Sequence, residues 1–583
     1  MLEEPPVRPK RILIVGGGPA GLITLRNFVK LGTFERVELV ERRDDVGGVW
    51  YLENKSQNPS LRWSSPAYPG LIGNVLPEFL SFHDFPFPPP DQYDPEHRKN
   101  QPFPTLKETY DFLRAFAKPF LDDGRIRLGQ EVVRVEEVDN GDGSTKDKWR
   151  ARIRSWNDPV NPGAETEEKW DAVVVCAGWY DNPVWPETEG LDLLREKRLA
   201  VHAKEWNGPE GLEGKCTLII GNANSSNDIA SQLAPVALTP VYRSIRRPNF
   251  PGFVSLPDDR IEDVPPVKRY SLAGMKIKVE LENGRILEDV DIVLVGTGYK
   301  PYADFVHVLP PPLISGDSKS TTVPLMSLVG LNAPTLPDSD SKSSQKHSLV
   351  LTNRIPLLHR HILFAPSPSL AFILSTMAYT PFTIADVSSC WLALAWSEGG
   401  GLEYPKTLDE RLVFEKERLE AIEMGRREAQ GEDQTQSEEQ NQEETNDSKT
   451  PLHGGTTSET FDPSSSLVAA WVSGSNRHTP SSLNVYSALA ASEEDYANEL
   501  REDVVRARPE LGNAQILWNR SPESDGSGGM GSLYRYIPGG GLPEWSPERR
   551  KKREEMYPVK LASLKWAREK VGTGWSNREG EGN

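Results

Sequence analysis

Two stretches of the chain share one order of apolar and polar positions. Residues 12–15 form an apolar run, and a glycine turn separates it from a helical stretch at 21–31 and a second apolar run at 37–40. Short apolar runs on both sides of a helical pattern predict a β-α-β unit, with a parallel sheet and a ligand at the strand ends. The same start recurs at 217–220, which opens into a helical stretch at 221–230. The chain is therefore predicted to hold two nucleotide sites or a duplicated fold.

Other patterns predict antiparallel strands and a buried late segment. Residues 132–138 and 149–153 flank a turn rich in glycine and aspartate, and residues 275–281 lead through an Asn-Gly turn to the apolar run 290–295. Both patterns predict β-hairpins. The apolar stretch 370–396 is interrupted by polar residues that would be costly in lipid, so it predicts a segment buried in protein.

Charge and cysteine content argue against several classes of binding partner and of active site. The formal net charge of -18 argues against a nucleic-acid partner, since phosphates are bound by clusters of Lys and Arg. The three cysteines lie far apart, which argues against a dithiol redox pair and a disulfide framework, and no metal site is predicted. Residues 1–10 carry proline and charges instead of the apolar run of a secretory signal, so a cytoplasmic protein without a membrane anchor is expected.

The first glycine turn carries a dinucleotide-binding pattern. Gly16, Gly18 and Gly21 follow an apolar strand in the order G-x-G-x-x-G. They allow a tight turn, close approach of a pyrophosphate and close packing of helix on strand, and the helix N-terminus supplies N–H donors. Glu41 ends the next strand, where a carboxylate can accept the ribose hydroxyls. The predicted dinucleotide contacts are this turn and this acid, namely Gly16, Gly17, Gly18, Pro19, Ala20, Gly21 and Glu41.

The second turn keeps only part of that pattern. Gly221 opens it, but Ala223 and Ser226 stand where glycines are expected. Small residues still allow a phosphate to approach, and the hydroxyls of Ser225 and Ser226 could add hydrogen bonds to it. A turn that no longer binds a nucleotide is the alternative. The predicted contacts are Gly221, Ser225, Ser226, Asn227 and Asp228.

Beyond the first turn the chain resembles the flavin-containing monooxygenases. Residues 47–50 read G-G-V-W and match the family's G-G-x-W segment, which lies along the FAD. Residues 71–78 and 82–88 are similar to the family's stretch T-N-x-x-K-E followed by D-F-P, although Gly73 and Pro77 replace its Thr and Lys. The resemblance implies further FAD contacts at Gly48, Val49 and Trp50.

Asn74 keeps its place within this stretch. The family's Asn contacts bound NADP and the flavin and helps to hold the C4a-hydroperoxyflavin, so the resemblance implies that Asn74 is the catalytic residue and that Gly73 beside it contacts a cofactor. An amide offers donors and an acceptor without a charge. A plain turn is the alternative, because Gly and Asn are also typical turn residues.

The resemblance also assigns roles to two later sites. Arg243 matches the position at which the family grips the 2′-phosphate of NADPH, a task that suits a bidentate guanidinium, and Arg246 and Arg247 are alternatives. Thr297 and Gly298 lie in a G-T-G-Y turn similar to the passage between the family's domains. They are expected to pack against FAD, with an ordinary turn as the competing interpretation.

His202 and Trp206 fit the end of the family's identifying motif, F-x-G-x-x-x-H-x-x-x-W/Y. The front half of that motif is absent, because Glu196 and Arg198 replace its Phe and Gly. A structural histidine at the joint between domains is therefore an equal alternative.

The resemblance implies an α/β fold with two Rossmann-like dinucleotide-binding domains, a three-layer ββα FAD domain and an inserted NADPH domain. The expected divisions are a first part of the FAD domain at 1–183, the inserted NADPH domain at 184–286, a second part of the FAD domain at 287–425, an acidic disordered insert at 426–465, and a C-terminal extension packing on the FAD domain at 466–583.

The implied activity is oxygenation of a soft nucleophilic nitrogen or sulfur of a small molecule through a C4a-hydroperoxyflavin, with FAD, NADPH and O2. This is the reaction class of the N,N-dimethylaniline monooxygenases, EC 1.14.13. Two alternatives stay open: a Baeyer–Villiger monooxygenase acting on a ketone, which Trp206 favours slightly, and a nucleotide-binding protein without turnover. The substrate, the role of the extension, and the choice between a monomer and a homodimer are not determined by the sequence.

Overall fold

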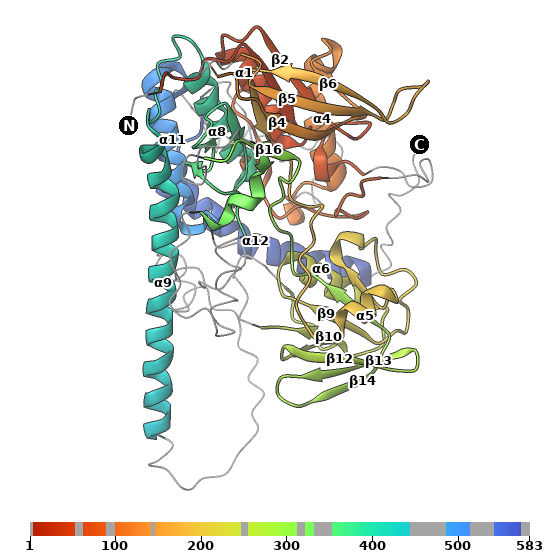
Figure 1. The fold of residues 1–583 in the computed structure, drawn as a ribbon. Coiled ribbons are helices and arrows are strands. Elements are labelled where there is room, and N and C mark those ends of the chain that lie inside the picture. Colours follow the sequence, from red (N-terminus) through yellow and green to blue (C-terminus); the bar gives the residue numbers. More distant parts are fainter. Residues whose placement is uncertain are drawn as a thin grey trace, which may run out of the picture.

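The structure is a computed structural model that describes most of the chain. The described residues are 4–52, 62–88, 99–141, 146–246, 255–311, 321–331, 353–443, 486–512 and 541–572. They form two bodies, an upper one around β1 and α1 and a lower one around β9 and α6 (Figure 1). Of the described helices, none combines the length and the apolar character that a membrane crossing requires.

The upper body is built on a seven-stranded sheet with a parallel centre. Its strands in spatial order are β18 (Leu358–His359), β19 (Leu363–Phe364), β20 (Leu370–Phe372), β7 (Ala172–Val175), β1 (Arg11–Val15), β2 (Arg36–Val40) and β3 (Ile126–Arg127). A second sheet lies over it, in the order β17 (Val323–Pro324), β16 (Val306–Val308), β4 (Gln130–Glu137), β5 (Trp149–Ser155) and β6 (Ala164–Trp170). The antiparallel pair β4–β5 is the first predicted hairpin, which is confirmed.

The two faces of β1 explain why this body has three layers. Ile12 and Ile14 are buried in one core with the helices α1 (Pro19–Leu31), α4 (Leu106–Asp122) and α8 (Pro381–Trp396). Leu13 and Val15 point into a separate core, which they share with the second sheet. Because successive side chains of a strand point to opposite faces, an unbroken apolar run in the sequence indicates that both faces are covered. The sheet is therefore sandwiched between helices and a second sheet.

The lower body repeats this plan and is inserted between β7 and β16. Its parallel sheet has the order β11 (Ile261–Val264), β10 (Val241–Ser244), β9 (Thr217–Ile220), β15 (Ile292–Val295) and β8 (Ala200–His202). The helices α5 (Leu191–Glu196) and α6 (Asn224–Leu233) and a three-stranded sheet complete it, the sheet comprising β12 (Val267–Ala273), β13 (Lys276–Leu281) and β14 (Ile286–Val290). The pair β13–β14 is the second predicted hairpin, which is also confirmed.

The strands of the lower body continue past the expected division at 286/287. β14 starts at that division and pairs with β13, and β15 pairs with both β8 and β9. The sequence pattern did not show where the chain returns to the upper body, because β15 is an apolar run like the strands of the upper sheet. We propose that the inserted domain ends after Val295.

The late apolar stretch forms β20 and the buried helix α8, as predicted. After it, α9 (Leu408–Glu443) extends well beyond the upper body (Figure 1). This helix runs through residues 426–443, where the composition predicts disorder, and the acidic insert at 426–465 stays a prediction. Glu, Gln, Ala and Arg favour helix, and the buried first turns at Arg411 and Glu415 supply a formed helix to extend. Residues 444–465 lie outside the described part.

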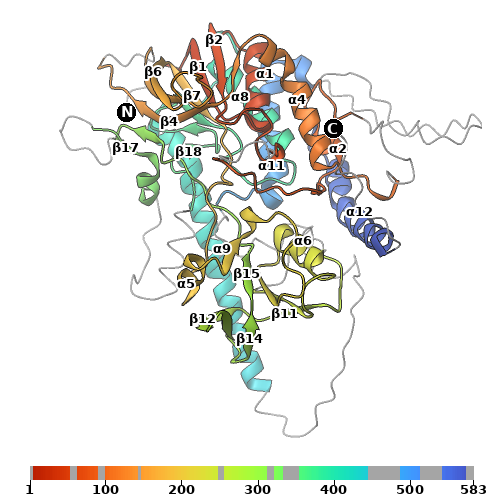
Figure 2. The ribbon, with the colours of Figure 1, turned by 90° about the vertical axis from the view of Figure 1, so that its right-hand side faces the viewer.

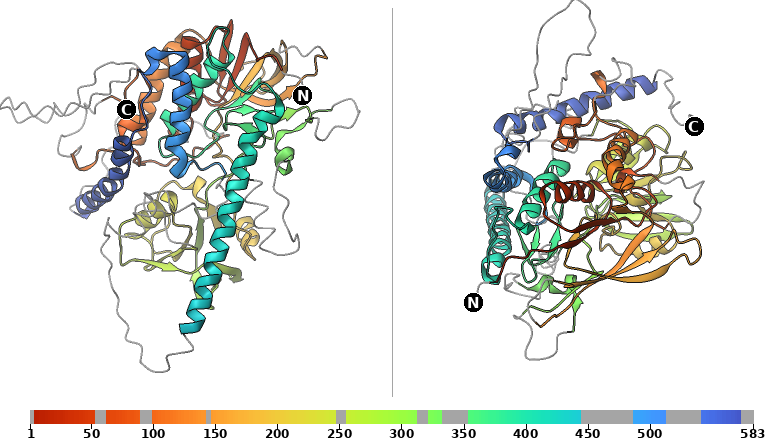
Figure 3. Two further views of the ribbon diagram at one scale, coloured as in Figure 1. Left: turned by 90° about the vertical axis from the view of Figure 1, so that its left-hand side faces the viewer. Right: turned by 90° about the horizontal axis from the view of Figure 1, so that it is seen from above.

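Among the described residues of the C-terminal extension, α11 and α12 are the α-helices. α11 (Glu493–Ala507) lies beside α8, and α12 (Pro547–Gly572) begins earlier than the predicted helix at 559–571. Figures 2 and 3 show α12, in blue, starting near α11 at the upper body and running along one side of the molecule. The remaining short elements are α2 (Pro77–Leu80), η1 (Gly48–Trp50), η2 (Ala203–Glu205), η3 (Leu325–Gly330), η4 (Ala490–Ser492) and η5 (Pro509–Gly512).

Candidate functional site

The first glycine turn connects β1 to α1 and is packed too closely to hold larger residues at some of its positions. Gly16 has φ of +107°, which L side chains rarely adopt. A Cβ on Gly21 would overlap the carbonyl oxygen of Gly16. Pro19 occupies the first turn of α1, and Ala20 is buried behind it. The turn therefore requires glycine at both ends for backbone reasons alone.

Glu41 closes this turn from the end of β2. It is 6% exposed, and its Oε2 accepts the N–H of Gly17 at 2.6 Å while its Oε1 accepts the N–H of Arg43 at 2.9 Å. Each carboxylate oxygen has a second lone pair, so Glu41 can still accept hydroxyl groups of a ligand. The sequence-predicted pair of turn and acid is thus brought together.

The segment Gly47–Trp50 lies against the same turn. The N–H of Gly47 donates to the carbonyl of Gly17 at 2.9 Å, and a Cβ on Gly48 would come within 2.9 Å of the Cα of Gly18. The hydroxyl of Ser65 donates to the carbonyl of Val49 at 2.5 Å. The ring of Trp50 meets that of Phe382 edge to face, at 6.5 Å between centroids. The predicted FAD residues of both segments therefore form one continuous surface.

This surface fits a dinucleotide. The N-terminus of α1 has no side-chain cap and no acidic residue in its first turn. Such an end presents free N–H groups and a positive dipole to an anion. The glycine contacts between Gly18 and Gly48 keep side chains out of the approach to it.

The second turn follows β9 in the same topology. Gly221 has φ of +109°, and a Cβ there would lie 2.9 Å from the carbonyl oxygen of Gly296. The helix α6 also begins without a side-chain cap or an acid in its first turn, with Ala223 as its N-cap residue. This end, too, fits an anionic group such as a phosphate.

The two serines of the second turn differ in what they can contact. Ser225 is exposed, whereas Ser226 is fully buried and its hydroxyl lies 3.3 Å from the carbonyl of Ile220 and 3.4 Å from that of Gly296. The expectation that Ser226 donates to a phosphate therefore differs from its place in the structure. Its hydroxyl is directed to the strand ends, and it occupies the space that a glycine leaves empty in the first turn.

Arg243, at the end of β10, is held by its neighbours. Its guanidinium forms a bidentate pair with Asp263, at 2.7 and 3.0 Å, and donates to Asn227 at 2.8 Å and to Ser255 at 3.1 Å. The carboxylate of Asp263 offsets its charge. Arg246 is exposed at the same strand end, and Arg247 lies outside the described residues.

Asn74 lies on a loop that reaches the lower body. Gly73 before it donates to the carbonyl of Pro104 at 2.8 Å, and a Cβ on Gly73 would lie 3.1 Å from that oxygen. The side chain of Asn74 is exposed and forms no hydrogen bond within the described part of the chain. Earlier on the same loop, the hydroxyl of Tyr68 donates to Asp228 of α6 at 2.7 Å. Burial and the adjacent Asp228 raise the pKa of the Tyr68 hydroxyl, which keeps it a donor.

Thr297 and Gly298 belong to the joint between the bodies. The hydroxyl of Thr297 donates to the carbonyl of Val184, and the N–H of Val184 donates to the carbonyl of Gly298 at 2.9 Å. A Cβ on Gly298 would meet no described atom, so its φ of +82° explains the glycine. The outgoing and returning chains thus pair with one another. Contact of these two residues with FAD stays a prediction.

His202 and Trp206 are buried beside this joint. The ring of His202 packs against those of Trp185 and Tyr299, and its Nδ1 accepts the N–H of Lys204 at 3.1 Å. Burial lowers the pKa of His202 to about 4, so the ring is neutral at pH 7. The indole of Trp206 donates to Gln232 of α6 at 3.3 Å. These contacts support the structural interpretation of the motif end.

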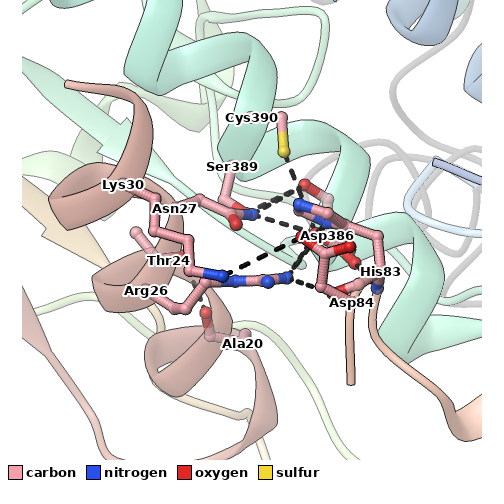
Figure 4. A network of polar contacts seen from close by, with 10 residues as sticks. All are labelled: Ala20, Thr24, Arg26, Asn27, Lys30, His83, Asp84, Asp386, Ser389 and Cys390. Carbon is pink, nitrogen blue, oxygen red and sulfur yellow. Dashed lines mark hydrogen bonds and ion pairs between the residues drawn. The ribbon is translucent and has the colours of Figure 1, made fainter. Parts of the chain in front are cut away.

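A buried polar network lies behind the first turn and joins α1 to α8 (Figure 4). Asp386 accepts the N–H of His83 at 2.7 Å and the side-chain amide of Asn27 at 2.9 Å, and the guanidinium of Arg26 lies 3.8 Å away. Burial alone would raise the pKa of Asp386, but His83 and Arg26 hold it below its ordinary value. The ligand atoms of His83, Asp386 and Cys390 lie within 4.8 Å of one another. We propose no metal site there, because Asp386 is already bonded and a cationic guanidinium adjoins it.

Two site residues escaped the sequence analysis. Tyr68 has no motif around it. Lys560 of α12 donates to the carbonyl of Gly73 at 2.8 Å, although the extension shows only faint resemblance to the family. The spacing of Met556, Lys560 and Ser563, which lie on one face of a helix, is the signal that could have identified a docked face.

Comparison with known proteins agrees with this geometry. The family model described as flavin-binding monooxygenase-like matches residues 9–249. The chain is 29% identical over 336 residues to the flavin-containing monooxygenase FMO GS-OX3 of Arabidopsis thaliana, which covers 53% of this chain and 68% of that protein. It is 28% identical over 388 residues to the thiol-specific monooxygenase of Saccharomyces cerevisiae, which covers 65% of this chain and 75% of that one.

A solved structure supports the fold independently. The S-allyl-L-cysteine S-oxygenase from Allium sativum superposes with a TM-score of 0.55 at 21% identity, covering 85% of this chain and 88% of the other. The family model covers both glycine turns and the segment between them. The chain is therefore similar to the flavin-containing monooxygenases, with residues 9–249 matching their family model, and it shares its fold with a solved S-oxygenase.

Proposed function

We propose that this protein uses NADPH and O2 to oxygenate a soft nucleophilic sulfur or nitrogen atom of a small molecule, with sulfur as the first choice. The proposal depends on one combination of features. The helices α1 and α6 each begin without a side-chain cap behind a glycine turn, and the loop that lies between these turns in the sequence presents the free amide of Asn74. Relatives named as a thiol-specific monooxygenase and an S-allyl-L-cysteine S-oxygenase support sulfur.

The first turn would hold FAD. The N–H groups at the start of α1 would bind its pyrophosphate, and Glu41 would accept its ribose hydroxyls. Val49 and Trp50 would line the flavin end, because Gly48 already touches Gly18 in the turn. FAD, once reduced by NADPH, supplies the chemistry that activates O2. The residues of the proposed FAD site are Gly16, Gly17, Gly18, Pro19, Ala20, Gly21, Glu41, Gly48, Val49 and Trp50.

The second turn would hold NADPH. The start of α6 would bind its pyrophosphate, with Gly221 and the exposed Ser225 nearest to it. Asn227 orients Arg243, and Asp228 ties α6 to the Tyr68 loop, so we propose that both act by placing the site. Arg243 or Arg246 would contact the 2′-phosphate.

Asn74 would act between the two cofactors. A carboxylate there would introduce a charge, and an apolar residue would offer no hydrogen bond. A neutral amide can donate and accept at once, which suits a role in orienting bound groups while the closed site excludes water. We therefore propose Asn74 as the catalytic residue, with Gly73 fixing its backbone.

The test begins with the purified, FAD-loaded protein. Its absorbance spectrum should show bound flavin, and under air it should consume NADPH and convert a thioether to its sulfoxide. Asn74→Ala should retain FAD and reduce flavin with NADPH while sulfoxide formation falls and hydrogen peroxide rises. Colourless protein that added FAD cannot reconstitute, or sulfoxide formation unchanged in Asn74→Ala, would refute the respective parts of the proposal.

The two alternatives have distinct outcomes in the same assay. Ester formed from a cyclic ketone without any sulfoxide would indicate a Baeyer–Villiger enzyme, and no NADPH consumption would indicate a protein without turnover. The residue that favoured the ketone reaction, Trp206, is 6% exposed and bonded to Gln232 within the lower body. Trp206 therefore supports α6. Its contacts with the described residues give no reason to prefer the ketone reaction.

A further inference from the structure

The C-terminal helix α12 contacts the upper body along much of its length. Its contacts there come from side chains on successive turns, and those of Lys552, Met556 and Lys560 meet the Asn74 loop and the short helix α2 that follows it. Met556 receives the N–H of Leu76 at 3.4 Å, and Lys552 lies 3.5 Å from Glu78. Farther along α12, the buried Ser563 donates to Gln101 at 2.6 Å. The helix is thus docked on the segment between the two nucleotide turns.

The far end of α12 contacts the lower body. Arg568 donates to the carbonyl of Pro257 at 2.7 Å, and its guanidinium lies 3.6 Å from Asp258. The carboxyl pKa of Asp258 is lowered to about 2, chiefly by its hydrogen bond with Arg260 and less by Arg568. One helix therefore bridges both bodies at the level of α6, as Figures 1 and 2 also show.

Lys560 lies midway between these two sets of contacts. Its ammonium donates to the carbonyl of Gly73 at 2.8 Å and lies over the ring of Phe103, 4.8 Å from the centroid. The carboxylate of Asp228 on α6 is the charged group that acts on it, and Asp228 in turn accepts the hydroxyl of Tyr68. A single amine therefore bonds to the backbone of the Asn74 loop, and the nucleotide helix supplies the carboxylate that acts on it electrostatically.

We propose that α12 is a strap that fixes the two nucleotide-binding bodies relative to one another, and that Lys560 is a positioning residue that holds the Gly73–Asn74 loop against α6. The proposal rests on the proposed function, since it assigns to Asn74 and α6 their roles at the cofactors. It also gives the long extension a role, because α12 adds contacts across a joint at which the linkers pair with one another and Tyr68 bonds to Asp228.

Backbone geometry explains how one amine can act on Asn74. The Gly73 backbone is held on one side by its N–H bond to Pro104, and a β-bridge joins Ile72 to Thr105. Lys560 holds the opposite group of the same residue, the carbonyl. With both groups fixed, the direction in which Asn74 leaves the loop is fixed as well.

The first experiment measures the strap without relying on turnover. Amide hydrogen exchange of segments 71–76 and 547–572 should be slow in the unaltered protein, and Arg568→Gln and Lys560→Met should each speed it in both segments. Lys565→Met, a change of an exposed lysine on the same helix, is the matched control and should leave exchange unchanged. Unchanged exchange in both variants would overturn the strap. This readout exists in flavin-free protein, so it is separate from failure of the proposed function.

The second experiment isolates the role of Lys560 in the holoenzyme. Lys560→Met should keep its FAD, raise KM for NADPH and the dissociation constant of NADP+ about 10-fold, and change kcat little, because a charge-assisted hydrogen bond at the binding joint is lost. Lys560→Arg should restore most of the affinity. Normal NADP+ affinity in Lys560→Met would overturn the positioning role.

The pH profile provides a signature that simple loss of packing does not produce. Burial lowers the pKa of Lys560 to about 8, opposed by Asp228. The ammonium loses its proton as the pH rises through that value, so NADP+ affinity should fall between about pH 7 and pH 9. Lys560→Met should remove this inflection, and its persistence would assign the titration to another group.

Discussion

The two glycine turns of this protein share a topology but close in opposite ways. In the first, Gly21 lets the helix approach so closely that a Cβ would overlap the carbonyl oxygen of Gly16. In the second, Ser226 takes the corresponding place and directs its hydroxyl to the carbonyls of Ile220 and Gly296. The contrast teaches that a β-α turn can pack against the backbone carbonyls at its strand ends in two ways. Either the backbone of a glycine approaches them directly, or a small side-chain hydroxyl fills the space and is directed to them.

The residues that end the neighbouring strands differ as well. Glu41 is buried and bonded only to backbone N–H groups among the described residues, so each of its carboxylate oxygens keeps a lone pair that could accept from a ligand. Arg243 already meets Asp263, Asn227 and Ser255. Glu41 is thus held by backbone groups alone among the described residues, whereas Arg243 is held by three side chains.

The largest effect is expected at the tightest contact. Gly21→Ala places a methyl group against backbone that cannot move aside, so it should destabilise the protein by about 3 kcal/mol and abolish FAD binding. Thermal unfolding and the flavin content of the purified variant measure both effects. Retention of normal flavin content would show that the first turn is as permissive as the second.

Much of this comparison was predictable from the sequence. The strand, glycine turn, helix and acid of the first site follow from local pattern, because each residue is needed for backbone geometry. The three-layer plan was implied by the resemblance to the family, and the apolar runs that cover both faces of the strands agree with it. Local pattern also located both hairpins and the buried segment that forms β20 and α8.

The features that could not be predicted depend on contacts between residues that are far apart in the sequence. The direction of the Ser226 hydroxyl depends on Gly296, and the orientation of the Arg243 guanidinium depends on Asp263. Lys560 meets Gly73 across most of the chain. A pattern within one segment holds no information on such pairs, so composition and spacing leave them open.

Glu41→Gln should give the next largest effect. A glutamine has one acceptor oxygen and one NH2 group, so it cannot accept both the Gly17 and Arg43 N–H groups as the carboxylate does. We expect about 2 kcal/mol weaker FAD binding, or roughly a 30-fold higher dissociation constant, measured by flavin fluorescence. Glu38→Gln on the same strand is the control; its partly exposed pairs with Arg36 and Arg127 predict little change in FAD affinity.

The arginines of the second site should give a smaller effect. If Arg243 grips the 2′-phosphate, Arg243→Gln should lower the preference for NADPH over NADH about 10-fold, and Arg246→Gln should change it little. The ratio of kcat/KM for the two nucleotides measures this preference. Loss of preference only in Arg246→Gln would assign the phosphate to Arg246 and leave Arg243 as a structural partner of Asp263.

Ser226→Gly should have the smallest effect and tests the comparison most directly. The change restores the glycine pattern of the first turn, removes two long hydrogen bonds, and places a glycine in a helix, which costs about 1 kcal/mol. Because the hydroxyl is buried and directed to the strand ends, KM for NADPH should stay within about 2-fold of its original value. Chemical denaturation and NADPH kinetics on one preparation separate these effects. A large rise in KM with unchanged stability would mean that the hydroxyl contacts the nucleotide, and the two turns would then bind their phosphates through different groups.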